Sequence, residues 1–433
     1  MAHKLHLISI GKGISKISQS LNRGNGSTWP GHVALMGNKN FIKDILSNSD
    51  IKTIIVAGTN GKTTTAGLIR VGLEKNSKKV IQNNSGANLL NGVASSLLLH
   101  TNAKGQLTQN FALFEVDENA LPAVLEQVTP DYLVLLNLFR DQLDRYGEIN
   151  TISQKWNESI AKLPKQTKLI LNADDPQIAY IGLQNKLETS YFSLDATKIK
   201  EQTHEAADSL SCPKCGNQLT FITTTFSHLG QWKCDNCGLK QPKPTLTSFS
   251  IYPLSGTYNK YNTHAAALVL EHVGIHKKEI TDAFSQFTPA FGRQEIIKYH
   301  ERNVQLFLSK NPTSFNQSYA TIKELNATTL IIVLNDRIPD GRDISWIWDT
   351  ELPEIDGFKH IFVAGDRMYD MAVRLKYELG VQKFADKVQT FEILKDAIDA
   401  SITSTSIDET VYILPTYSAM LDARKILTGK KIL

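Results

Sequence analysis

The chain has 433 residues, a length that favours more than one domain, because a single hydrophobic core rarely grows so large. Hydrophobic residues make up 41% and charged residues 21% of the sequence, which excludes a disordered or fibrous protein. The net charge of +4, from 47 basic and 43 acidic residues, argues against nucleic acid as the main partner.

The N-terminal segment is basic and amphipathic. Its first 43 residues contain no Asp or Glu, and Ile10, Ile14, Ile17 and Leu21 recur at helical spacing. We expect residues 1–45 to form a basic amphipathic segment that packs on the next domain, with contact to a membrane surface as the alternative. Apolar runs in the chain stay well below the roughly 18 residues of a membrane span, and polar residues interrupt any secretory signal. A soluble protein is expected.

A nucleotide-binding loop follows the first buried strand. Residues 51–57 are β-branched and apolar, residues 66–74 have a helical pattern, and Gly58-Thr-Asn-Gly-Lys-Thr-Thr-Thr65 lies between them. Glycines allow backbone N–H groups to converge on phosphates, Lys62 supplies a positive charge, and Thr63 offers a hydroxyl to Mg²⁺. We therefore predict that Gly58, Thr59, Asn60, Gly61, Lys62, Thr63 and Thr64 bind a nucleotide.

All four cysteines belong to two Cys-x-x-Cys pairs. Cys212 and Cys215 form the first pair, Cys234 and Cys237 the second, and residues 216–233 separate the pairs. Two such knuckles complete the tetrahedron that Zn²⁺ prefers, and four protein ligands leave no position for a reactive water. We predict a structural zinc ribbon; two disulfides are the alternative. No thiol would then be free to act as a nucleophile.

The C-terminal third reads as a second parallel sheet. Strand patterns recur at residues 304–308, 329–334, 360–364 and 410–414, and polar or turn residues follow each of them. Helical patterns come after most of these turns. This alternation predicts a Rossmann-like domain whose ligand groups collect at the carboxyl ends of its strands.

The glycine loop resembles the central domain of the Mur ligases and folylpolyglutamate synthases, which join an amine to a carboxylate with ATP. Four further segments resemble that family in the same order, namely residues 111–118, 137–146, 171–176 and 256–266. The resemblance implies that Glu115 binds Mg²⁺ together with Thr63, and that Asn259 contacts adenine. Gln142 and Tyr258 stand where many members have histidine, which leaves a second metal site open.

Motifs in the last domain narrow this resemblance to one family. Asn311-Pro-Thr-Ser-Phe-Asn316 and Asp340-Gly-Arg-Asp-Ile-Ser-Trp-Ile-Trp-Asp349, with the four-cysteine insertion, resemble the MurT family of synthetase subunits of lipid II isoglutaminyl synthase. The implied fold class is α/β: a Mur ligase-type P-loop domain over 46–290, a ribbon insertion near 205–243, and a Rossmann-like domain over 291–433.

The MurT resemblance also implies a reaction. ATP would activate the α-carboxylate of D-glutamate in the lipid II stem peptide, and ammonia would then displace phosphate to give D-isoglutamine. Lys62 and Glu115 would serve catalysis at the phosphates, Arg293 or Arg342 would complete the phosphate clamp, and Asp349 would act with the partner. Expected cofactors are ATP, Mg²⁺ and structural Zn²⁺.

The same resemblance implies a GatD-type glutaminase subunit as the source of ammonia. It also implies a bacterial, cytoplasmic protein with at most peripheral contact at the inner face of the membrane. Two alternatives stay open at this point. One is an amino-acid ligase of the Mur ligase or folylpolyglutamate synthase type that acts alone, and the other is a nucleotide-gated protein whose ribbon binds nucleic acid. The near-neutral charge argues against the second.

Overall fold

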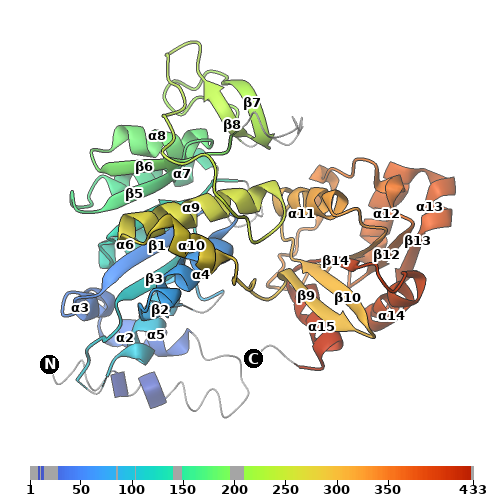
Figure 1. The fold of residues 1–433 in the computed structure, drawn as a ribbon, viewed down its shortest axis with the longest axis horizontal. Coiled ribbons are helices and arrows are strands. Elements are labelled where there is room, and N and C mark those ends of the chain that lie inside the picture. Colours follow the sequence, from blue (N-terminus) through green and yellow to red (C-terminus); the bar gives the residue numbers. More distant parts are fainter. Residues whose placement is uncertain are drawn as a thin grey trace.

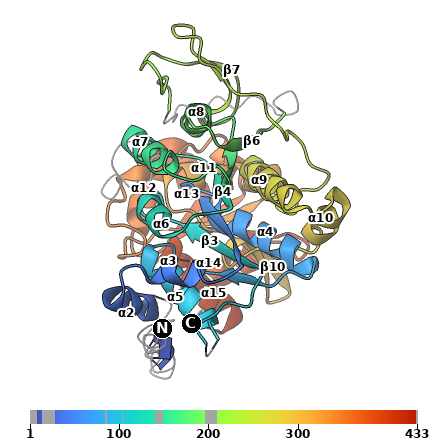
Figure 2. The ribbon, with the colours of Figure 1, turned by 90° about the vertical axis from the view of Figure 1, so that its left-hand side faces the viewer.

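The computed structural model describes residues 8–9, 11–13, 28–83, 86–102, 104–139, 149–195 and 209–430. Two α/β units follow one another along the chain, and a small hairpin extends from the first (Figure 1). The view from the side shows this hairpin projecting beyond the first sheet, next to α8 (Pro176–Gln184) (Figure 2).

The first unit contains a six-stranded parallel sheet in the order β2-β3-β1-β4-β5-β6. Its strands are β1 (Lys52–Ala57), β2 (Val80–Gln82), β3 (Phe111–Val116), β4 (Tyr132–Leu135), β5 (Lys168–Asn172) and β6 (Glu188–Phe192). Ile54 and Val56 enter one core cluster, whereas Ile55 and Ala57 enter another, so β1 is buried on both faces. Burial on both faces explains why this strand is apolar without alternation.

Helices cover both faces of this sheet. One core cluster draws on α4 (Lys62–Lys75), α9 (Thr257–Val273) and α10 (Lys277–Phe284). The opposite cluster draws on α8 and on α2 (Trp29–Gly37), α3 (Phe41–Leu46), α5 (Leu90–His100), α6 (Leu121–Gln127) and α7 (Ile149–Ile160). The glycine loop that begins at Gly58, which we call the phosphate loop, therefore lies at the carboxyl end of the central strand β1, where ligand groups gather in open parallel sheets.

The four cysteines belong to an insertion between β6 and α9. Its antiparallel hairpin consists of β7 (Thr220–Phe226) and β8 (Leu229–Lys233), which lie between the two cysteine pairs. A small core of cysteines, Leu219 and Trp232 packs against Ala179 of α8. The insertion thus has its own core and rests on the first unit, which we call the middle domain.

The second unit contains a six-stranded sheet in the order β13-β12-β11-β14-β10-β9. Its strands are β9 (Arg293–Tyr299), β10 (Arg302–Phe307), β11 (Thr329–Val333), β12 (His360–Ala364), β13 (Val388–Phe391) and β14 (Val411–Pro415). The four strands predicted from sequence pair in parallel with one another, as expected. The edge strands β9 and β13 were not predicted, and β9 runs antiparallel to β10.

Helices also cover both faces of the second sheet. One core includes α11 (Pro312–Glu324), α12 (Met368–Leu379) and the short 3₁₀ helices η2 (Ser345–Asp349) and η3 (Ile355–Gly357). The other includes α14 (Leu394–Ser404) and α15 (Tyr417–Thr428), and α13 (Val381–Lys387) lies beside β13. α11 packs against α9, so the two units meet there (Figure 1).

Most of the predicted N-terminal helix, including Ile10, Ile14, Ile17 and Leu21, lies outside the described residues. Within the described part, Ile8 is buried in the first core and Lys12 Nζ donates a hydrogen bond to the carbonyl of Thr101. Among the described helices, none combines the length and apolar composition required to cross a membrane.

Candidate functional site

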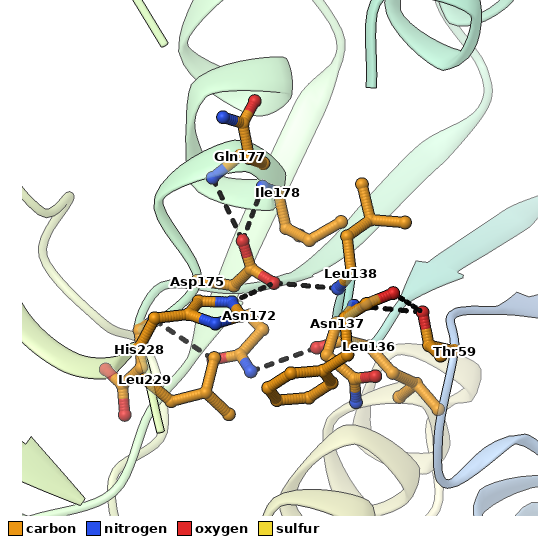
Figure 3. Close-up of polar contacts among 12 residues, drawn as sticks. Thr59, Leu136, Asn137, Leu138, Asn172, Asp175, Gln177, Ile178, His228 and Leu229 are labelled. Atoms are coloured by element: carbon orange, nitrogen blue, oxygen red, sulfur yellow. Dashed lines mark hydrogen bonds and ion pairs between the residues drawn. The ribbon is translucent and has the colours of Figure 1, made fainter. Parts of the chain in front are cut away.

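The segment that follows β4 forms hydrogen bonds with the phosphate loop. Asn60 N–H donates to Asn137 Oδ1 (2.9 Å), and Asn137 Nδ2 donates back to the Asn60 carbonyl (3.1 Å). Thr59 N–H donates to the Asn137 carbonyl, and Phe139 N–H donates to Thr59 Oγ1, at 3.0 Å each. Figure 3 shows this contact between Thr59 and the strand-end segment. These four hydrogen bonds hold the loop in its conformation.

Gly61 stands where the loop turns into α4. Its φ of +91° lies in the left-handed region, and a Cβ atom there would approach Asn262 Oδ1 of α9 to 2.1 Å. Any larger residue would be strained and would displace the side-chain amide of Asn262. The glycine predicted for phosphate binding thus also allows the close approach of two helices, α4 and α9.

Lys62 is the first residue of α4 and folds back over the loop. Its Nζ donates to the carbonyls of Gly58 and of Thr59 (3.2 Å) and lies 3.1 Å from Glu118 Oε2. The side chains of Lys62 and Glu118 are only 11% and 5% exposed. Sequence reasoning did not single out Glu118, although it belongs to the predicted carboxylate-rich strand end at residues 111–118.

The two residues predicted to bind Mg²⁺ lie together. Thr63 Oγ1 donates to Glu115 Oε2 at 2.6 Å, and the other carboxylate oxygen of Glu115 accepts from Gln82 Nε2 at 3.1 Å. Asn83 Oδ1 accepts the backbone N–H of Glu115 at 2.9 Å, which fixes the strand end. A buried carboxylate oxygen beside a hydroxyl is the kind of oxygen donor pair that Mg²⁺ accepts, so these residues fit the metal.

A cavity of about 90 Å³ lies between the two units, next to this loop. It is lined from the middle domain by Asn60, Gly61, Thr64 and Asn259, among others, and from the second unit by Arg293 and by residues at the start of α11. The buried Nδ2 of Asn60 has no hydrogen-bond partner among the described residues, so it can still donate to a ligand. Small-ligand pockets usually measure about 300–1,000 Å³, so a nucleotide requires this cavity to widen.

Arg293 is the first residue of β9 and brings a positive charge from the second unit. Burial lowers the pKa of Arg293, and the negative charge of Glu115 partly offsets this effect. The next residue, Gln294, donates through Nε2 to the Ser255 carbonyl (2.8 Å) and to Tyr258 Oη (3.0 Å), just before and within the first turn of α9. These bonds hold Arg293 next to the helix that carries Asn259.

Arg342 does not line this cavity. It lines a second cavity of about 500 Å³ in the C-terminal domain, together with Trp348, Arg367 and Tyr369. The structure therefore brings Arg293, and not Arg342, to the phosphate loop. A role for Arg342 at the phosphates stays a prediction that would require the domains to move.

Asp349 ends η2 beside this second cavity. Its side chain is exposed, and in the part of the chain that the structure describes its carboxylate forms neither a hydrogen bond nor an ion pair. The neighbouring aromatic residues Trp348, Tyr369 and Tyr377 are 52%, 63% and 77% exposed. This carboxylate is thus available to a group outside the described chain.

The four cysteines converge as predicted. Their sulfur atoms all lie within 4.8 Å of one another, and Cys212–Cys237 and Cys215–Cys234 Sγ separations are both 3.6 Å. Zinc–sulfur bonds of about 2.3 Å in a tetrahedron place sulfurs about 3.8 Å apart, so the cluster fits Zn²⁺. None of the four cysteines is joined by a disulfide in the structure, which favours a metal site over two disulfides.

Both knuckles turn as their sequence predicts. Gly216 and Gly238, which follow the second cysteine of each pair, have φ of +75° and +72°. Their N–H groups donate to the carbonyls of Cys212 (2.9 Å) and Cys234 (3.0 Å). Gln142, which bears on a second metal site, lies outside the described residues, as do its neighbours in the range 140–148.

Comparison with known proteins places these features in one family. Residues 56–270 match the Mur ligase middle domain, and residues 308–420 match the MurT ligase C-terminal domain. The chain is 31% identical over 391 residues, 86% of each chain, to a Staphylococcus aureus (strain COL) protein named lipid II isoglutaminyl synthase (glutamine-hydrolyzing) subunit MurT. The chain belongs to the MurT family.

A second MurT relative, from Streptococcus pneumoniae (strain ATCC BAA-255 / R6), is 31% identical over 432 residues, and the match covers 94% of each chain. Among solved structures, a pseudomurein peptide ligase type C from Methanothermus fervidus aligns with a TM-score of 0.66 and 20% identity, covering 90% of this chain and 81% of the other. That likeness supports the Mur ligase fold.

The two family matches contain most of the candidate site residues. The middle-domain match contains Lys62, Thr63, Glu115 and the four cysteines, and the MurT C-terminal match contains Asp349 and the second cavity. Arg293 lies between the two matched regions. The sequence analysis did not identify Glu118, which pairs with Lys62, or Gln82, which donates to Glu115. Both lie at or just after strand ends, where polar residues could have been considered as candidates.

Proposed function

We propose that this chain is the synthetase subunit of a glutamine-dependent lipid II isoglutaminyl synthase. The observation that carries the proposal is that Lys62 and the Thr63–Glu115 pair lie at the phosphate loop, while Arg293 of the second unit lines the interdomain cavity next to that loop. Such a cluster of cations and metal ligands is what transfer of a phosphoryl group to a carboxylate requires.

In this proposal, the α-carboxylate of D-glutamate in the stem peptide takes the γ-phosphoryl group of ATP, which leaves ADP and an acyl phosphate. Ammonia then attacks the acyl carbon, phosphate departs, and D-isoglutamine remains. Lys62 and Arg293 would hold the phosphates, Thr63 and Glu115 would hold Mg²⁺, and Asn259 would contact the adenine. The Mg²⁺ would neutralise charge on the phosphates as the phosphoryl group moves.

Ammonia must come from elsewhere, because glutamine hydrolysis of this type needs a cysteine nucleophile. All four cysteines of the sequence lie in one cluster. We propose that a GatD-type glutaminase subunit supplies the ammonia and docks near Asp349, whose exposed carboxylate could orient a histidine of the partner. The exposed aromatic side chains around Asp349 fit the composition of protein interfaces.

We further propose that the cysteine cluster holds one structural Zn²⁺, and that the protein works in the bacterial cytoplasm at the inner face of the membrane that carries lipid II. Nucleic acid is not expected as a partner. The assigned roles of Gly58, Thr59, Asn60, Thr64 and Arg342 belong to the same proposal.

The test is amidation of lipid II by the purified chain, alone and with the glutaminase, followed by mass spectrometry. With both subunits, Mg²⁺, ATP and glutamine should convert the glutamate carboxyl to an amide and release ADP and phosphate. The chain alone should do so with ammonium but not with glutamine. Addition of an amino acid in place of ammonia would instead favour an amino-acid ligase that acts alone.

A further inference from the structure

The hairpin formed by β7 and β8 has two very different ends. The strands begin and end next to the cysteine cluster, where Cys215 and Cys237 are partly exposed. The opposite end, residues 226–229, which we call the hairpin tip, is buried in the middle domain: Phe226, His228 and Leu229 are 4%, 1% and 2% exposed. The tip enters the same core cluster as Val56 and Ala66, on either side of the phosphate loop.

The tip also reaches the nucleotide cavity. Phe226 lines this cavity together with Asn60, Gly61 and Asn259. Its ring lies 5.3 Å from the ring of Phe139, the residue whose N–H donates to Thr59. The cysteine insertion therefore supplies one side chain of the cavity lining.

His228 places the tip beside Asp175 and beside the segment that binds the phosphate loop (Figure 3). Its Nε2 lies 3.5 Å from Asp175 Oδ2, and its ring lies 4.7 Å from that of Phe139. The same oxygen of Asp175 accepts the N–H of Leu138 at 2.8 Å. Leu138 lies between Asn137 and Phe139, the two residues that bind the phosphate loop.

Two features show that this arrangement is more than ordinary packing. Neither ring nitrogen of His228 has a hydrogen-bond partner among the described residues, although such a buried polar group is costly. Asp175 is fully buried, and its other oxygen already caps α8 by accepting from Gln177 N–H and Ile178 N–H. The imidazole thus lies beside a carboxylate whose remaining contact is the loop-bearing segment.

The hairpin is fixed to the strand end that carries Asp175. Trp232 Nε1 donates to the Ala173 carbonyl at 3.0 Å, and Gly230 N–H donates to the Asp174 carbonyl at 3.1 Å. Trp232 also packs in the small core with Cys212 and Cys234. The position of the tip therefore depends on the same hairpin that the cysteine cluster closes.

We infer that the cysteine insertion is a working part of the nucleotide site: Phe226 forms one wall for the bound nucleotide, and His228 is a positioning residue that aligns the phosphate loop through Asp175. This inference rests on the proposed use of ATP. The insertion would thus contribute to nucleotide affinity and would not be only a separate structural element.

The test is calorimetric titration of the full-length chain with MgADP, with zinc content and thermal unfolding measured on each variant. Phe226→Ala and His228→Phe, which keeps an aromatic ring but loses the imidazole nitrogens, should each bind MgADP about tenfold more weakly, equivalent to about 1.4 kcal/mol. His228→Gln, whose amide can donate to Asp175, should bind within about threefold of the original chain. Zinc content should not change in any of them.

Ile222→Ala is the matched control, since Ile222 lies on β7 of the same hairpin but is 52% exposed. It should bind MgADP as the original chain does. Phe226→Leu, which keeps an apolar side chain, replaces Phe226→Ala if the latter does not fold, and should also lose affinity.

The outcomes separate the inference from the proposed function. If the original chain binds MgADP and the folded, zinc-loaded tip variants bind it equally well, the inference is wrong and the proposed function stands. If the tip variants and Ile222→Ala weaken binding alike, the effect is general destabilisation and the inference is also wrong. If the original chain binds no MgADP, the proposed function itself fails.

Discussion

Replacing Lys62 by alanine should remove catalysis and also destabilise the middle domain, because this lysine neutralises a buried carboxylate. Lys62 Nζ and Glu118 Oε2 are 3.1 Å apart, and both side chains are largely shielded from water. Without Lys62, the buried Glu118 carboxylate loses its ion-pair partner. The carbonyls of Gly58 and Thr59 lose a donor at the same time.

The magnitude follows from this burial. Removing one partner of a buried ion pair costs about 3–5 kcal/mol, and because the two side chains retain some exposure we expect the lower end, about 3 kcal/mol. For a domain of this size that corresponds to a drop of about 9 °C in melting temperature. Loss of the charge at the phosphates should reduce product formation by at least about a hundredfold.

The assay compares three variants by chemical unfolding and by phosphate release. The double variant Lys62→Ala/Glu118→Gln replaces the carboxylate by a neutral amide, so most of the lost stability should return while activity stays absent. Lys168→Ala is the matched control, because its ion pair with Glu188 has a similar length, 2.8 Å, but side-chain exposures of 34% and 56%. Water screens that exposed pair, so its loss should change the stability little.

Two results would refute this reasoning. If Lys62→Ala is no less stable than Lys168→Ala, then Glu118 does not depend on Lys62 for its charge balance. If Lys62→Ala forms product at a near-normal rate, then Lys62 is not the residue that holds the phosphates.

Three further predictions concern the metal, the pH dependence and the partner. Metal analysis should find about one zinc per chain, and its removal by a chelator should lower the unfolding temperature. Burial raises the pKa of Asp174 to about 6. As the pH rises from about 4 to about 6, the chain should therefore lose up to about 3 kcal/mol of stability relative to Asp174→Asn. Chemical unfolding of both proteins across that pH range measures the difference. Asp349→Asn should leave MgADP affinity unchanged yet abolish glutamine-dependent amidation in the presence of the glutaminase, and unchanged amidation would reject the role of Asp349.

The phosphate loop could be predicted because its signal is local. A strand, a glycine loop and a helix follow one another within residues 51–74, and the structure places them as expected, as β1, the loop and α4. The two cysteine knuckles are local in the same sense. Cys-x-x-Cys followed by glycine specifies a tight turn, and both glycines adopt positive φ. Such local patterns specify the backbone geometry without information from the rest of the chain.

Contacts that tertiary folding creates could not be read in this way. Phe226 and His228 lie within residues 216–233, which in the sequence read only as the spacer between the cysteine pairs. Their function depends on where the hairpin tip enters the middle domain, and nothing in the local pattern specifies that position. Arg342 shows the opposite case. Its Gly-Arg-Asp motif led to the prediction that it binds the phosphates, but the fold places it in a separate cavity.

The charges around the phosphate loop are nearly balanced before a nucleotide binds. Lys62 pairs with Glu118, Arg293 faces the charge of Glu115, and Lys310 also lines the cavity, so three cations meet two carboxylates. A polyphosphate alone would add more negative charge than this small positive excess neutralises, in a region of low dielectric. A divalent ion at Thr63 and Glu115 would reverse this balance, and it would replace the hydrogen bond that now joins these two residues.

Nucleotide binding should therefore depend strongly on Mg²⁺. Calorimetry with ADP should show at least about tenfold weaker affinity when Mg²⁺ is omitted, without a chelator, so that the cysteine cluster keeps its metal. Glu115→Gln removes one carboxylate charge from the site, so it should improve the affinity for metal-free ADP while reducing the gain that Mg²⁺ provides. Equal ADP affinity with and without Mg²⁺ would show that the phosphates do not bind beside Glu115, since only at that position does the balance of charge require a metal.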